Sequence, residues 1–93
     1  MRLTIYSKPG CHLCDEMKLL VHRVIAQQPS DQPIALDEID ISTDRELLDR
    51  YSLEIPVLLI DGKKVAKYRV PEAELTQMLN ARRVERKGER GER

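Results

Sequence analysis

The sequence of 93 residues lacks any long apolar run. Its longest uninterrupted apolar stretch covers residues 55–60 and includes a proline, whereas a membrane-spanning helix needs about 18 apolar residues in a row. We therefore expect a soluble chain without a membrane partner. The N-terminus leads directly into a strand-like pattern and lacks the basic, apolar and small-residue succession of a secretory signal. A cytoplasmic location is expected.

The chain also has no excess of charge, because 16 basic residues balance 16 acidic ones. Basic residues are concentrated in the last twelve positions, but glutamates are interspersed there and aromatic residues are missing. Nucleic-acid binding relies on unopposed positive charge and often on aromatic stacking, so no nucleic-acid partner is expected. Poor in apolar residues and containing two glycines, this segment resembles disordered chain ends. We expect one domain over residues 1–81 and a frayed or disordered charged tail over residues 82–93.

Cysteine is scarce, and the two that occur are only three positions apart. Cys11 and Cys14 directly follow strand-like residues 2–6 and open a helix-like stretch. Three residues along a helix bring two Cα atoms to roughly 5 Å, within the window of about 4.4 to 6.8 Å that an unstrained disulfide accepts. The spacing therefore predicts a pair that opens and closes a disulfide without moving backbone.

The position of the pair at a helix start predicts unequal roles for the two sulfurs. Unpaired N–H groups and the positive end of the helix dipole stabilise a thiolate in the first turn. The pKa of the Cys11 thiol is thus expected below the value near 8.5 of a free cysteine. Cys14 lies one turn deeper and should stay protonated until it resolves a mixed disulfide.

Neighbouring polar residues allow functional and structural interpretations. His12 could tune the redox pair through a hydrogen bond or a proton shuttle, or it could be a simply exposed side chain. Lys8 could bring positive charge to the thiolate or to a substrate carboxylate, or it could be a solvated lysine. We interpret Asp15 and Glu16 as residues that stabilise the helix start.

Metal handling is the main alternative to redox chemistry. Soft sulfur ligands make a copper or zinc carrier, or a dimer that shares an iron–sulfur cluster through Cys11, chemically possible. A self-contained zinc site would need four ligands. His22 lies eleven residues beyond Cys11, or about 16 Å along one helix, so it does not complete such a site. An interaction module with an inert Cys11 is a third interpretation.

The apolar periodicity predicts seven elements in the order β-α-β-α-β-β-α. Their expected bounds are residues 2–6, 11–28, 34–41, a short helix from 43 to about 51, the two hairpin strands 56–60 and 63–68, and a last helix that begins at Pro71.

Two local motifs support these bounds. The sequence Thr43-Asp44-Arg45-Glu46 has the form of a capping box headed by the threonine, and Asp61-Gly62 suits a tight type I′ turn. The element order predicts an α/β fold with a mixed four-stranded sheet and helices on both faces. The cysteines would follow the carboxyl end of the first strand, where open α/β sheets place their active loops.

Residues 4–14, the dipeptide Ile55-Pro56 and residues 61–63 together resemble the glutaredoxins and, more broadly, the thioredoxin-fold oxidoreductases, over roughly residues 2 to 80. This resemblance implies a thioredoxin-like, glutaredoxin-type fold in which Cys11 is the nucleophile and Cys14 resolves. It also implies that Pro56 is cis and faces the pair, and that backbone at Ile55 pairs with the substrate as an added strand. Considered without the resemblance, Pro56 is expected to be a trans edge residue, as most prolines before a strand are.

The chain departs from the family pattern at two places. His12-Leu13 stands where glutaredoxins commonly have Pro-Tyr, and residues 65–69 stand where they have a Gly-Gly-aspartate stretch that binds glutathione. Lys8 and Ile55 carry over as glutathione contacts, whereas Ala66 and Lys67 do not.

We therefore expect a monomeric dithiol–disulfide oxidoreductase that serves electron transport and cell redox homeostasis. Its substrate would be a disulfide-containing protein or a glutathione mixed disulfide. No bound cofactor is expected, and the reducing equivalents would come from glutathione or from a thioredoxin-reductase-type donor.

Overall fold

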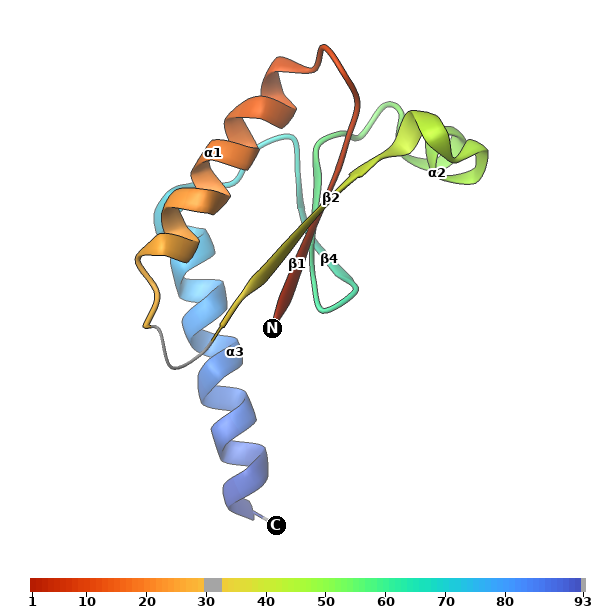
Figure 1. Ribbon diagram of the computed structural model, residues 1–93. Coiled ribbons are helices and arrows are strands. Elements are labelled where there is room, and N and C mark those ends of the chain that lie inside the picture. The colour runs from red at the N-terminus through yellow and green to blue at the C-terminus, as the bar shows by residue number, and fades with distance from the viewer. Residues whose placement is uncertain (30–32, 93) are drawn as a thin grey trace.

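The computed structural model describes residues 1–29 and 33–92, with side chains as far as Arg82. These residues form four strands, three α-helices and one 3₁₀ turn (Figure 1). In chain order these are β1 (Arg2–Ser7), α1 (His12–Ala26), β2 (Ala35–Asp40), η1 (Ile41–Thr43), α2 (Arg45–Tyr51), β3 (Val57–Ile60), β4 (Lys63–Lys67) and α3 (Glu72–Glu92).

The four strands form one mixed sheet in the order β2-β1-β3-β4. β1 pairs with β2 in parallel and with β3 antiparallel, and β3 and β4 form an antiparallel hairpin. This arrangement confirms the predicted α/β class, the thioredoxin-like sheet and the element order. The carboxyl end of β1 therefore lies at the edge of the sheet from which the cysteine segment departs.

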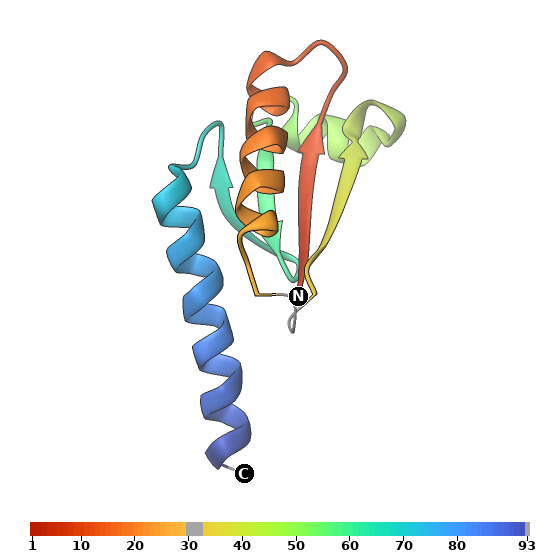
Figure 2. The same ribbon diagram turned by 60° about the vertical axis from the view of Figure 1, so that its left-hand side comes forward.

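Helices lie on both faces of the sheet. α1 and α3 lie together against one face, and α2 lies on the other side (Figures 1 and 2). The alternation along β1 explains this division, because Leu3 and Ile5 point into the core while Tyr6 points to the opposite face. There the Tyr6 ring contacts the Tyr51 ring of α2 at a centroid distance of 4.9 Å.

The main core lies between the sheet and the pair α1 and α3. Residues at three- and four-residue spacing on α1 supply one side of it, as their periodicity predicts. Burial of such apolar side chains contributes roughly 1.5 to 3 kcal/mol each. The buried members are Leu3, Ile5, Met17, Val21, Val24, Leu58, Ile60, Val70, Leu75 and Leu79.

The apolar residues Leu36 and Ile39 of β2 lie on opposite faces of the sheet. Leu36 pairs with Leu3 in the register with β1, so it packs against the main core. Ile39 pairs with Tyr6, which places it on the opposite face. As an edge strand, β2 contributes one apolar residue to each face, and its predicted last residue, Ile41, instead belongs to η1.

The predicted capping box at Thr43 is wrong. Thr43 ends the 3₁₀ turn, and its hydroxyl donates to the backbone oxygen of Asp40 at 2.8 Å. Asp44 is the N-cap of α2, because its carboxylate accepts from the N–H groups of Glu46 at 3.0 Å and Leu47 at 3.2 Å. An aspartate caps a helix as well as a threonine does, and the preceding turn decides which of the two adjacent residues is in position.

The hairpin between β3 and β4 is confirmed. Asp61 and Gly62 have φ angles of 50° and 85°, the positive values that a type I′ turn requires. The Asp61 carboxylate also accepts from the backbone N–H of Arg2 at 2.8 Å. The turn is thereby attached to the start of β1.

Helical backbone continues through α3 as far as Glu92, past residue 81, where the predicted domain ends and a frayed or disordered tail was expected. Glutamate, arginine and lysine are good helix formers, and nine of the last twelve residues are of these types. Their propensity favours continuation of the helix despite the two glycines.

We predict that Asp44→Ala lowers the free energy of unfolding by about 1 kcal/mol, the usual cost of losing an N-cap. Urea denaturation measures the change. Asp49→Ala, an exposed aspartate on the same helix, is the matched control and should shift stability by less than about 0.5 kcal/mol. Equal effects of the two substitutions would contradict the assignment of the cap.

Candidate functional site

The two cysteines lie where β1 gives way to α1. Gly10, with a φ of 82°, turns the chain in a conformation that favours glycine, and the N–H of Cys11 donates to the backbone oxygen of Lys8 at 3.3 Å. Cys11 is the N-cap of α1. The loop thus delivers Cys11 to the first turn of the helix, as the sequence predicts.

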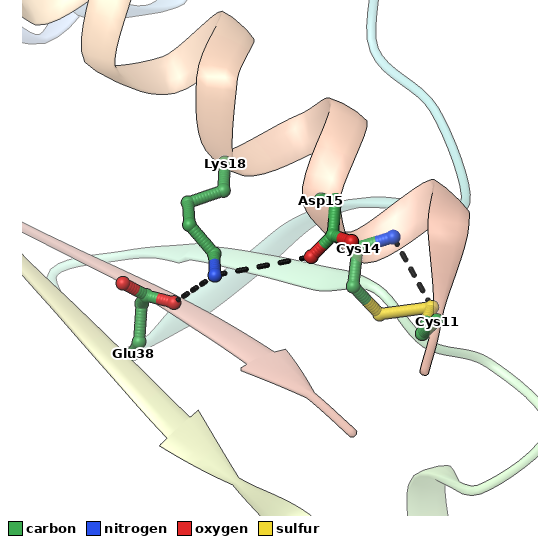
Figure 3. A network of polar contacts seen from close by, with 5 residues as sticks. All are labelled: Cys11, Cys14, Asp15, Lys18 and Glu38. Carbon is green, nitrogen blue, oxygen red and sulfur yellow. Dashed lines mark hydrogen bonds and ion pairs between the residues drawn. A yellow bond between two sulfur atoms is a disulfide. The ribbon is translucent and has the colours of Figure 1, made fainter. Parts of the chain in front are cut away.

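Cys11 and Cys14 form a disulfide, with their Cα atoms 5.2 Å apart (Figure 3). The Cys11 Sγ atom accepts a hydrogen bond from the backbone N–H of Cys14 at 3.1 Å, so the sulfur takes the place that a capping oxygen usually fills. Cys11 is half-buried, whereas Cys14 is only 2% exposed. An approaching disulfide therefore reaches Cys11 first.

The Ile55-Pro56 peptide bond is cis, as the family resemblance implies. Val57 pairs with Tyr6, so Pro56 lies level with Ser7, where the cysteine loop begins. Pro56 is buried, and its backbone oxygen accepts from the N–H of Tyr68 at 2.8 Å. Among the described residues no backbone–backbone hydrogen bond involves Ile55.

The structure places the two candidate polar residues differently. Lys8 is exposed and lines a cavity of about 210 Å³ together with Cys14 and Asp40. His12 is exposed on the first turn of α1, and the contacts of the described residues give its imidazole no hydrogen-bond partner. Only Lys8 is therefore brought into the surroundings of the buried sulfur.

A network of charged side chains was not predicted. The Lys18 Nζ atom lies 2.8 Å from a Glu38 carboxylate oxygen and 3.9 Å from an Asp15 carboxylate oxygen (Figure 3). The hydrogen bond from Lys18 to Glu38 and their opposite charges raise the pKa of Lys18 above its usual value. The four-residue spacing of Cys14 and Lys18, which places both on one helix face, was the available sequence signal.

A second feature missed by the sequence analysis is an apolar groove of about 470 Å³ between α1 and the segment after β4. Leu13, between the two cysteines, lines it, as do Leu19, which is 66% exposed, and Tyr68. Two ion pairs border it, Arg69 with Glu16 at 3.6 Å and Arg23 with Glu72 at 3.8 Å. Leu19, an apolar residue outside the three- and four-residue spacing of the buried residues Met17, Val21 and Val24, was the available signal.

The donor set does not fit a self-contained metal site. Among the described side chains, those of residues 1–29 and 33–82, no group of three or more His, Cys, Asp or Glu is placed to hold a metal ion. His22 is exposed. No helix in this part of the chain is both long and apolar enough to span a membrane.

The chain belongs to the glutaredoxin-like family, since the family model described as "Glutaredoxin-like domain (DUF836)" matches residues 2–80. A curated relative from Dictyostelium discoideum, "Glutaredoxin-like protein YDR286C homolog", is 26% identical over 77 residues, which cover 81% of this chain and 71% of the relative. The fold is similar to the X-ray structure of target protein XcR50 from X. campestris, with 28% identity and a TM-score of 0.68, covering 85% of this chain and 96% of the other.

Similarity of fold extends to the thioredoxins. A mutant thioredoxin from Halobacterium salinarum matches 86% of this chain and 72% of its own length, with 22% identity and a TM-score of 0.57. The chain is therefore a glutaredoxin-like protein with a thioredoxin fold and a disulfide-forming cysteine pair at the end of β1.

We predict that Asp40, in the wall of the cavity beside Cys14, titrates below 3.8. Hydrogen bonds from the hydroxyl and N–H of Ser42 lower its pKa, and the charge of Lys8 adds a smaller effect in the same direction. A lowered carboxyl pKa contributes stability that is present above the unfolded value, near 3.9, and is lost as pH falls through the folded value.

Ser42→Ala removes the hydroxyl donor, which lies 2.6 Å from the Asp40 carboxylate. We expect the NMR titration midpoint of the Asp40 carboxyl carbon to rise, and the loss of stability as pH falls below the unfolded value to become smaller. An unchanged midpoint would contradict the assigned cause.

Proposed function

We propose that the protein is a dithiol–disulfide oxidoreductase that reduces protein or mixed disulfides through Cys11 and Cys14. The observation that carries the proposal is the disulfide between a sulfur at the helix N-cap and a buried sulfur one turn away. Backbone N–H groups at that position stabilise negative charge, which favours the attacking thiolate form of Cys11.

The reaction has two exchange steps. The Cys11 thiolate attacks a substrate sulfur, a Cys11–substrate disulfide forms, and the other substrate sulfur leaves as a thiolate. Cys14 then attacks Cys11, the intramolecular disulfide forms and the second substrate thiolate leaves. The substrate has gained two electrons and the pair has lost two, which an external dithiol donor or two glutathione molecules must restore.

The same proposal assigns roles to the surroundings. The free backbone of Ile55, beside the cis Pro56, supports pairing with an extended substrate segment. The protein would act as a monomer in the cytoplasm, without a bound cofactor. Its reducing equivalents would come from glutathione or from a thioredoxin-reductase-type donor.

The apolar groove favours a protein segment over glutathione as the main substrate. It continues from Leu13, between the reacting cysteines, and its bordering charges are already paired with one another. A neutral, apolar wall offers little to the two carboxylates of glutathione. It suits a polypeptide that carries apolar side chains near its disulfide.

We predict that the alkylation rate of reduced Cys11 reaches half its maximum at least about one pH unit below 8.5. Iodoacetamide kinetics against pH measure this midpoint, with Cys14→Ser used to isolate Cys11. Turnover should be lost in Cys11→Ser, whereas Cys14→Ser should accumulate a mixed disulfide that mass spectrometry detects. A Cys11 that titrates like a free cysteine would remove the catalytic assignment.

We predict that Leu19→Gln raises KM roughly fivefold for a peptide disulfide flanked by leucines, since losing about 1 kcal/mol of apolar contact corresponds to that factor. KM for glutathione disulfide should stay unchanged. His22→Gln, an exposed residue of the same helix outside the groove, is the control. A similar rise for both substrates, or none for the leucine peptide, would contradict a role of the groove in recognition.

A further inference from the structure

The second exchange step of the proposed reaction raises the question of where the Cys14 proton goes. Cys14 is buried on the α1 face that points toward the sheet, and Lys18 projects from the same face one turn further on (Figure 3). A cavity of about 210 Å³ is lined by Cys14 and by the charged residues Lys8, Asp15, Lys18 and Asp40. Since a water molecule occupies about 30 Å³ in the liquid, this space holds several.

The carboxylates around this cavity differ in their availability as bases. Asp40 already accepts two hydrogen bonds from Ser42, at 2.6 and 2.9 Å, which favour its ionised form. Glu38 is held against the Lys18 ammonium at 2.8 Å. Asp15 makes only a 3.9 Å contact with Lys18, and the described hydrogen bonds give its carboxylate no further donor.

Asp15 also has a more favourable position than Asp40 or Glu38 for accepting a proton from Cys14. It follows Cys14 directly, and both residues line the cavity. Lys18 is fixed to β2 through Glu38, so its ammonium stays at the cavity and attracts the Asp15 carboxylate toward it. The network thus holds one weakly engaged carboxylate beside a thiol that must lose its proton.

We propose that Asp15 accepts the proton of Cys14 in the resolving step, and that Lys18, anchored by Glu38, is the positioning residue for Asp15. This inference rests on the proposed function and assigns a residue to its second half. The Cys14 Sγ–H bond breaks as the sulfur attacks Cys11, and the proton passes directly or through cavity water to Asp15. The bond between Cys14 and Cys11 forms, and the substrate thiolate leaves and later takes a proton from solvent.

The charges that face Cys14 agree with this assignment. Around the cavity, the ammonium groups of Lys8 and Lys18 stand against the carboxylates of Asp15 and Asp40, and Glu38 pairs with Lys18. The three carboxylates outnumber the two cations, which disfavours a standing thiolate at Cys14. A base that removes the Cys14 proton during the attack therefore accelerates resolution more here than it would among an excess of cations.

The test separates the two exchange steps in one experiment. Reduced protein is mixed with a symmetrical nitrobenzoate disulfide, each half of which leaves as a coloured thiolate. The first release reports attack by Cys11, and the second reports resolution by Cys14. Stopped-flow absorbance follows both phases in the wild type, Asp15→Asn, Asp15→Glu and the control Asp49→Asn, which replaces an exposed carboxylate of α2 outside both the cavity and the groove.

We predict that Asp15→Asn slows the second phase about tenfold and leaves the first within twofold. We expect a smaller effect than the roughly hundredfold or greater contribution of many general bases. The Asp15 carboxylate is exposed, so water reaches its surroundings and also accepts the proton when the carboxylate is removed. Added formate should accelerate the second phase of Asp15→Asn and not that of the wild type, and Asp15→Glu should retain most of the rate. Lys18→Met should slow the second phase, and Lys18→Arg should restore it.

A second phase that is unchanged in Asp15→Asn, or equally slow in Asp49→Asn, would overturn the assignment. So would a slowed phase that neither formate nor the glutamate variant restores, since a purely structural role would give that result. Failure of the proposed function would differ from all of these, because the wild type itself would then release no first thiolate.

Discussion

The site depends on one hydrogen bond at the start of α1, from the backbone N–H of Cys14 to the Cys11 sulfur. A helix start leaves N–H groups without partners in the helix, and here a sulfur meets one of them. The same bond fixes the sulfur near its disulfide partner, because the donor belongs to Cys14 itself. The proposed activation of Cys11 as the nucleophile and its proximity to Cys14 therefore have a common cause in local backbone geometry.

Two sides of α1 then serve different purposes. Cys14, Lys18 and the core residue Val21 follow one another at three- and four-residue spacing and point toward the sheet. Leu13 and Leu20 lie on the side that borders the apolar groove. The proposed proton transfer at the buried sulfur and the proposed recognition of a substrate segment thus lie on different sides of the helix, so that a change on one side need not disturb the other.

The sequence could predict what depends on local spacing. The order of the elements, the buried face of α1, the Asp61-Gly62 turn and the cysteine pair all follow from short-range patterns. The cis bond before Pro56 followed from the family resemblance, since residue physics alone favours a trans bond.

Features that depend on contacts between elements could not be predicted. Thr43 and Asp44 are both competent caps, and the 3₁₀ turn before them selects Asp44. The pairing of Lys18 with Glu38 requires the register of β2 beside β1, which places Glu38 level with Ile5 on the face below α1. The groove requires the path of the chain after β4, where no repeating pattern exists.

Tyr68 lies in the stretch where the chain departs from the glutaredoxin pattern. It also forms hydrogen bonds with the chain on either side of Ile55, which we propose pairs with the substrate. It has a φ of 68°, a conformation that favours glycine, and it lies in the stretch where glutaredoxins carry their glycines. Its N–H donates to the Pro56 oxygen and its hydroxyl to the Leu53 oxygen, both at 2.8 Å. These bonds hold the chain on either side of Ile55 and leave the Ile55 backbone itself unpaired. A tyrosine here thus supports the strand that would receive a polypeptide and adds an aromatic wall to the groove, whereas a glycine would leave that space open. The substitution that weakens the likeness to a glutathione site therefore strengthens the case for a protein substrate.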